Sequence, residues 1–239
     1  AAGRSTVIRR SVLTVYPDRP AEVGVPGENP NLDVPQPDSL VLTGFVERVG
    51  DPIPLVAADG SAHQAERVLA EALDAMARAA GGGSPVAIAV PSYWGPAAVG
   101  ALRGALRTVP ALAPGGVPAA LVPDSAAALT ALQAAPGLPT TGVVALLDFG
   151  GTGTSISLAD AGAGFAPLGE TARFAEFSGD GVDALLLNHV IAASATDADD
   201  PAGTAAVGHA VGASVGGVPS AAAGAHRAAL EKRPASAVV

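Results

Sequence analysis

Residues 148–155 (DFGGTGTS) are the stretch whose residue types and spacing could do chemistry. They close an apolar run, 143–149, which predicts a buried strand ending in a carboxylate. Small residues let backbone N–H groups approach a ligand closely, and successive N–H groups in a tight turn can hold an anion. The Asp148 carboxylate could hold a hydrated Mg²⁺ beside that anion. The pattern suits a nucleotide phosphate, although a plain glycine-rich hairpin turn would also explain it.

The elements around this stretch alternate between strands and helices, which favours an α/β layered fold. Strands are predicted at 6–16, 41–49, 55–58, 85–90, 117–122, 143–149, 154–159, 164–168 and 171–177, with a loop at 17–40. Helices are predicted after the N-cap candidate Ser61 as far as Gly81–Gly83, and at 96–107, 125–133 and 180–193. The runs at 143–149 and 154–159 should pair as a hairpin, which would place the glycines in its turn.

Composition narrows the function classes. The chain has 239 residues, of which 49% are apolar, and a net charge of −9, so it can form a core but does not suit nucleic acid or an anionic membrane. It has no cysteine, which excludes disulfides and thiolate sites. Lys232 is the only lysine, which excludes a Walker A loop. The sequence shows no membrane-length apolar run and no signal peptide, so we expect a soluble cytoplasmic protein.

Four motifs occur in an order that resembles a known family. They are Val90–Trp94 (VPSYW), Ser125–Leu129 (SAAAL), 143–158 (VVALLDFGGTGTSISL) and Ser178–Asp183 (SGDGVD), with Asn188-His189 further on. This series resembles the nucleotide-binding domain of the DnaK-type, seventy-kilodalton heat-shock chaperones, within the actin-like ATPases. The resemblance covers about residues 85–192.

The resemblance implies a partial actin-like ATPase (ribonuclease H-like) fold, with mixed sheets and flanking helices. Residues 1–142 would belong to the first lobe, residues 143–193 would begin the second, and 194–239 would be a flexible Ala/Gly-rich tail. ATP or ADP with Mg²⁺ would bind between the lobes. If a complete form exists, ATP hydrolysis would be coupled to lobe closure and to a protein client or partner.

By the same resemblance, Gly150, Gly151, Thr152 and Gly153 would line the phosphates. Asp148 would be the catalytic and metal-associated carboxylate, next to Mg²⁺ and its waters. These roles agree with the chemistry that the residue types allow by themselves.

The chain also departs from the family pattern. It lacks the first phosphate loop, the catalytic lysine of the first lobe and the late adenosine motif. Pro123 stands where the family has a glutamate, with Asp124 one place later, and Ser155 stands where the family has an acid.

These departures leave several interpretations open. The chain could be an incomplete piece of such a domain, or a degenerate relative that has lost hydrolysis and acts as a pseudo-ATPase scaffold. A third interpretation is an unrelated α/β domain with a chance hairpin. The third interpretation is distinguished from the first two by whether the 143–160 hairpin packs beside the strand at 85–90 in one sheet.

Overall fold

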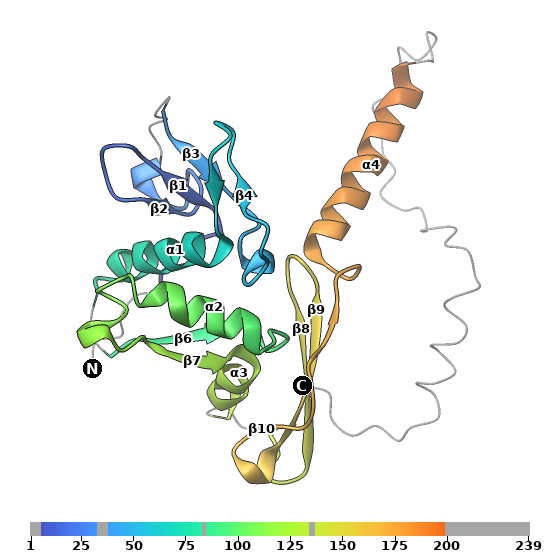
Figure 1. Cartoon of the computed structure of the whole chain (residues 1–239). Helices are drawn as coiled ribbons and strands as arrows, with labels where there is room; N and C mark the ends of the chain where they lie inside the picture. Colours follow the sequence, from blue (N-terminus) through green and yellow to red (C-terminus); the bar gives the residue numbers. More distant parts are fainter. Residues whose placement is uncertain (1–5, 33–37, 83–84, 134–136, 199–239) are drawn as a thin grey trace.

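The computed structural model describes residues 6–32, 38–82, 85–133 and 137–198. It shows a mixed α/β chain with several small sheets and, among the described residues, four α-helices (Figure 1). The helices are α1 (Ala65–Ala79), α2 (Pro96–Leu106), α3 (Asp124–Leu132) and α4 (Gly179–Ala198). The strands are β1 (Leu13–Val15), β2 (Glu22–Val23), β3 (Leu40–Leu42), β4 (Leu55–Val56), β5 (Ala62–His63), β6 (Ala87–Val90), β7 (Ala120–Pro123), β8 (Val143–Phe149), β9 (Thr154–Asp160), β10 (Ala166–Pro167) and β11 (Ala172–Phe174).

Helix α1 separates the first two hydrophobic cores. On one side it packs against the antiparallel sheet β2-β1-β3, where Val68 and Ala72 meet Leu13 and Phe45. On the other side it contacts α2, and Ala70 belongs to the second core. Alanine at the buried positions lets neighbouring elements approach α1 closely, so this short helix can serve two cores. Figure 1 shows the resulting succession of the β1–β3 sheet, α1, α2, and the β6–β7 pair.

Strands β6 and β7 form a parallel pair connected through α2. Their register runs from Ala87↔Ala120 to Val90↔Pro123. Leu102 and Leu106 of α2 are fully buried against this pair. Since the carboxyl ends of parallel strands meet at one edge, the residues that follow β6 and β7 are brought together there.

The predicted hairpin at 143–160 is confirmed. Strands β8 and β9 pair antiparallel from Val143↔Asp160 to Phe149↔Thr154, and β10 and β11 pair antiparallel with β9. This sheet is separate from the β6–β7 pair, so the single sheet that would have set the actin-like interpretation apart from an unrelated α/β domain is not observed among the described residues. A third core joins it to α3, because Leu129 packs with Ala159, Ala161 and Phe165.

The expectation that 143–149 is a buried strand is wrong. Its side chains alternate, so Val144 and Leu146 face the third core while Val143 and Phe149 are 65% and 76% exposed. Within the described ranges β8 pairs with β9 only, which leaves its outer edge unpaired.

Helix α4 begins beside the glycine-rich turn and extends away from the other elements (Figure 1). Leu185, Leu186, Leu187 and Ile191 on this helix are all at least 58% exposed. Such an apolar helix would normally be covered, because leaving large side chains in water costs the burial energy that usually stabilises a helix.

Three other expectations need correction. Ser61 does not cap α1; its N–H and hydroxyl both donate to Asp59 in the β4–β5 turn, and Gln64 stands at the cap. Of the strands predicted at 6–16 and 41–49 only β1 and β3 form, and a 3₁₀ turn at Val46–Arg48 follows β3. The loop predicted at 17–40 contains β2 and a 3₁₀ turn at Pro30–Leu32. Helix α4 continues to Ala198, past the predicted end at 193; the rest of the predicted tail, 199–239, lies outside the described residues.

Candidate functional site

The glycine-rich turn between β8 and β9 is closed by its own backbone. The N–H of Gly150 donates to the carbonyl oxygen of Gly153 over 2.9 Å. A Cβ on Gly150 would lie 2.9 Å from that same oxygen, closer than side-chain carbons approach backbone. Glycine is therefore required at position 150 by the turn itself, whether or not a ligand binds.

The start of α4 fixes the orientation of this turn. The N–H groups of Gly179 and Asp180 donate to the carbonyl oxygens of Gly150 and Gly151 over 3.1 and 2.8 Å. The N–H groups of Gly151 and Thr152, by contrast, donate no hydrogen bond to any part of the chain that the structure describes. Two adjacent donors in an exposed turn can receive an anion, as the sequence predicts.

A small cavity of about 200 Å³ lies between α3 and the face of the hairpin that carries Asp148. Its polar lining comes from Asp124, Ser125, Asp148, Ser155 and Ser157. The structure thus brings Asp124 and Asp148 to one cavity. Mg²⁺ commonly binds through one or two carboxylates together with waters and phosphates, so this donor set fits that ion.

Asp124 is also part of a structural junction. Its carboxylate accepts hydrogen bonds from the N–H of Ser92 over 3.0 Å and from the N–H of Ser125 over 2.7 Å. It accepts a further short hydrogen bond from the Ser92 hydroxyl. These contacts hold one carboxylate oxygen at the start of α3, so the side chain enters the cavity in a defined orientation.

A polar cluster lies on the other side of the turn, formed by Glu47, Tyr93, Thr152 and Arg173. Glu47 Oε1 accepts hydrogen bonds from the Thr152 hydroxyl at 2.6 Å and from Arg173 Nη2 at 3.2 Å. The Tyr93 hydroxyl donates to the same carboxylate and lies 2.9 Å from Oε2 and 3.1 Å from Oε1. Arg173 Nη2 also donates to Thr152 Oγ1 over 2.8 Å. The guanidinium stacks 4.5 Å from the centre of the Tyr93 ring.

The electrostatics of the cluster act on Tyr93. Burial, followed by the hydrogen bond and the negative charge of Glu47, raises the pKa of Tyr93 to about 12, whereas Arg173 opposes the shift. Tyr93 therefore remains a neutral hydrogen-bond donor at any physiological pH.

Two buried anchors position Glu47. It lies in a 3₁₀ turn, Val46–Arg48, between Phe45 in the first core and Val49 in the second, which are 1% and 8% exposed. The carboxylate itself stays near the surface. The backbone that carries it therefore cannot shift without disturbing both cores.

The predicted site residues meet different environments. Gly150, Gly151, Thr152 and Gly153 all lie in the turn, and Asp148 lines the cavity below it. The sequence reasoning missed the roles of Glu47 and Arg173, which carry no local motif and are 126 residues apart.

The adjacent aromatic residues Tyr93 and Trp94, just before α2, lie in different environments. Trp94 packs against the second core. Tyr93 instead contacts Glu47 and Arg173 in the polar cluster.

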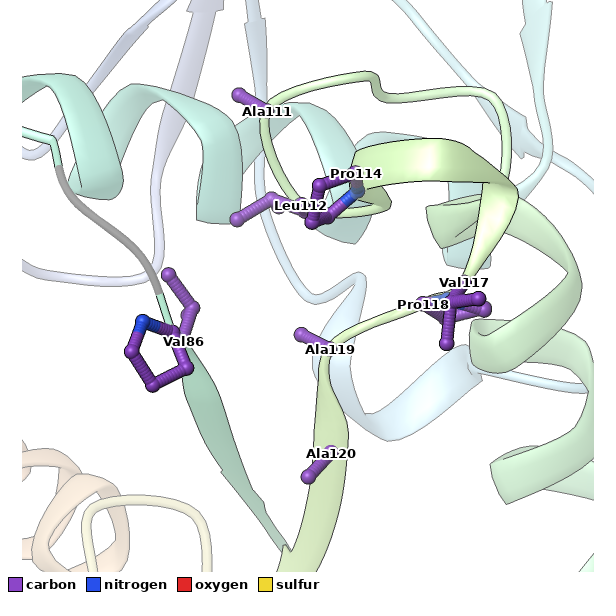
Figure 2. A pocket seen from close by; sticks show the side chains of 9 residues that line it. Val86, Ala111, Leu112, Pro114, Val117, Pro118, Ala119 and Ala120 are labelled. Carbon is purple, nitrogen blue, oxygen red and sulfur yellow. The ribbon is translucent and has the colours of Figure 1, made fainter.

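Two other hollows differ in chemistry from this site. Figure 2 shows one of about 260 Å³ beside β6 and β7, in which the lining is apolar or proline. Its lining residues are Pro85, Val86, Ala111, Leu112, Pro114, Val117, Pro118, Ala119 and Ala120. A wider apolar groove of about 760 Å³ lies on the opposite face of the hairpin, between Phe149, Phe174 and Val182. Neither hollow contains a carboxylate that could hold Mg²⁺.

In the described ranges, no three acidic or histidine side chains gather closely enough to hold a metal without another ligand. None of the described helices has both the length and the apolar character of a membrane span. Comparison of the chain with protein-family models and with curated proteins found no match.

Proposed function

We propose that the chain binds the phosphates of MgATP at the β8–β9 turn, as part of a DnaK-like, actin-type ATPase domain. The observation that carries this proposal is the pairing of two backbone donors, at Gly151 and Thr152, with the cavity lined by Asp124 and Asp148. Neither donor has an acceptor within the part of the chain that the structure describes. Donors for the phosphate oxygens and carboxylates for the metal thus lie on adjacent surfaces of one hairpin. The cytoplasmic location of the protein stays a prediction from sequence.

In this proposal the residues position and stabilise charge. The N–H groups of Gly151 and Thr152 bind phosphate oxygens, and Asp148 orients Mg²⁺ through its waters. Mg²⁺, when bound, neutralises phosphate charge. Hydrolysis would join a water oxygen to the γ-phosphorus and break the bond to the bridging oxygen, which leaves with ADP. The water proton would pass to a carboxylate of the cavity, Asp124 or Asp148.

The contacts between separate parts of the chain support a chaperone-like coupling. Glu47 belongs to the segment between β3 and β4, whereas Thr152 and Arg173 belong to the hairpin sheet. A ligand at the turn would therefore act directly on the contact between these parts. Such a contact can transmit nucleotide state to a partner if closure changes it.

Isothermal titration of the purified chain with ATP, with and without Mg²⁺, tests the proposal. Micromolar binding in the presence of Mg²⁺ is expected, and Asp148→Asn should weaken it only when Mg²⁺ is present. Asp18→Asn, an exposed carboxylate near β1, is the matched control and should bind as the unmodified chain does. A folded chain that binds no ATP at millimolar concentration would contradict the proposal.

A second candidate function is a pseudo-ATPase that serves as a protein-interaction scaffold. It is favoured by the missing first-lobe lysine and by the exposed apolar surface of Phe149, Phe177 and Leu185. Measurement of phosphate release separates the two functions. Binding without turnover supports the scaffold, whereas turnover that Asp148→Asn abolishes supports the ATPase.

A further inference from the structure

The polar cluster places a permanent positive charge beside the glycine-rich turn, and that charge belongs to Arg173. We propose that Arg173 is the phosphate-binding cation of this site, and that Glu47 occupies it until a phosphate group displaces the carboxylate. This inference rests on the proposed function, because it names the residue that recognises the phosphate and the contact that controls access to it.

Neutral partners hold the Arg173 guanidinium in place. Nη2 donates to Thr152 Oγ1 at 2.8 Å and Nη1 donates to Ser155 Oγ at 3.2 Å. The Tyr93 ring supports its face. None of these three groups carries a negative charge at neutral pH, so they orient the guanidinium and leave its charge available. Thr152 also supplies one of the two free backbone donors, which places the cation at the anion-binding turn.

The donors around Glu47 are those that a phosphate oxygen requires. The Glu47 carboxylate accepts from Thr152 and Arg173 at Oε1, at 2.6 and 3.2 Å, and from the Tyr93 hydroxyl, which lies 2.9 Å from Oε2 and 3.1 Å from Oε1. Two of these donors are hydroxyls and the third is a cation, and Tyr93 keeps its proton because its pKa is raised to about 12. The Glu47 carboxylate therefore occupies a position in which hydrogen-bond donors already surround an anion.

Exchange of this carboxylate for a phosphate is physically reasonable. The Glu47 and Arg173 side chains are 38% and 20% exposed, and ion pairs near solvent contribute little net stability. A triphosphate carries more charge and offers more acceptor oxygens, which strengthens its bonds to arginine. Among the described residues, Glu47 is the one carboxylate that forms an ion pair with Arg173, so its displacement removes the only such competitor there.

Titration calorimetry with two probes, MgATP and inorganic tripolyphosphate, tests the inference at constant ionic strength. Arg173→Gln should lower the affinity for both probes about tenfold or more, because the charge-assisted hydrogen bonds are lost. Arg173→Lys should retain part of the affinity. Glu47→Gln should bind both probes more tightly, which misfolding could not produce. The exposed Arg103→Gln variant on α2 is the matched control and should leave both affinities unchanged.

The outcomes separate this inference from the proposed function. If MgATP binds equally well to the unmodified chain, Arg173→Gln and Glu47→Gln, the inference is overturned while nucleotide binding stands. If the affinity for tripolyphosphate depends on Arg173 but MgATP binds no more tightly than tripolyphosphate, the role of Arg173 as the phosphate-binding cation is supported. The proposed recognition of the nucleotide is then contradicted. If neither probe binds any variant, including Glu47→Gln, both are overturned.

Discussion

The backbone N–H of Ser92 donates a hydrogen bond over 3.0 Å to the carboxylate of Asp124, and this contact joins the carboxyl ends of β6 and β7. The two residues are 32 positions apart, and α2 lies between them in the chain. The contact makes the edge of the parallel pair a fixed platform on which α3 begins. The position of the cavity beside Asp148 depends on this platform.

Removal of the Asp124 carboxylate should destabilise the platform. Asp124→Ala would leave the N–H of Ser92 without its acceptor, at a cost of about 1–3 kcal/mol, while the N–H of Ser125 keeps the Ser92 hydroxyl oxygen. Urea unfolding measures the change in free energy. The exposed Asp18→Ala control should stay within about 0.5 kcal/mol of the unmodified chain. Equal stabilities for the two variants would show that Asp124 does not hold this junction.

A methyl group at position 153 should displace the cation and also strain the turn, because Gly153 has a φ of +159°. A Cβ on Gly153 would lie 2.7 Å from Cζ of Arg173, the mobile end of a long side chain, which can move aside. Gly153→Ala should therefore fold and yet weaken tripolyphosphate binding about tenfold, through loss of the positioned charge. Titration calorimetry measures the affinity, and circular dichroism checks the fold.

Gly100→Ala is the control for this change. Position 100 lies in α2 and has open space around an added Cβ. Alanine is favoured over glycine in a helix interior by roughly 0.5–1 kcal/mol, so this variant should be slightly more stable and bind normally. Unchanged binding in Gly153→Ala would mean that the position of Arg173 is not important for the anion.

The ionisation of Tyr93 should report on the polar cluster. Burial and Glu47 raise its pKa to about 12, against about 10 for an unfolded tyrosine. The folded state thus holds this proton more tightly. The resulting stabilisation is fully present below about pH 10 and is lost as the pH rises through about 12. Ultraviolet absorbance of tyrosinate, compared between the unmodified chain and Tyr93→Phe, follows the titration.

The same titration identifies the cause of the shift. Glu47→Gln should lower the pKa of Tyr93 from about 12, because one negative neighbour is gone, but burial should keep it above the unfolded value. A pKa that does not respond to Glu47→Gln would show that Glu47 and Tyr93 are not in contact in solution.

The third core should hold the hairpin to the rest of the chain. Leu129 is 1% exposed and packs with residues of the hairpin sheet, so Leu129→Ala should destabilise the protein by about 2–5 kcal/mol. Leu185→Ala on α4, where the side chain is 73% exposed, should change stability by less than about 0.5 kcal/mol. Chemical denaturation compares the two. A small effect at Leu129 would mean that the hairpin and α3 unfold independently.

The sequence predicted those parts of the fold that local pattern controls. The helical spacing of apolar residues after Ser61 and within 96–107 indicated α1 and α2. The apolar run 143–149, the glycines that follow it and the alternation of 154–159 indicated the hairpin. The start of α1 was misplaced because Ser61 has two possible partners, a helix end or the Asp59 turn, and the β4–β5 pairing decides between them. Tertiary contacts of this kind leave no local signal.

The candidate site divides in the same way. The turn and Asp148 were predicted because they are contiguous in sequence. Glu47 and Arg173 become neighbours only when the η2 turn at Val46–Arg48 and strand β11 approach each other, which no spacing rule encodes. The charge of Asp148 at the end of β8 is evident from the sequence. The exposure of β8 could not be predicted, because burial depends on which elements cover the sheet.

The outer edge of β8, which has no partner strand among the described residues, gives Asp148 a second role. This strand has seven residues, and Asp148 is its only charged side chain. An unpaired apolar strand is a template for edge-to-edge pairing between molecules, and a charge near its end interrupts that pairing. Replacement of Asp148 by an uncharged residue should therefore promote aggregation as well as alter metal binding. Light scattering at several protein concentrations distinguishes the loss of a magnesium ligand from the loss of a charge that prevents aggregation.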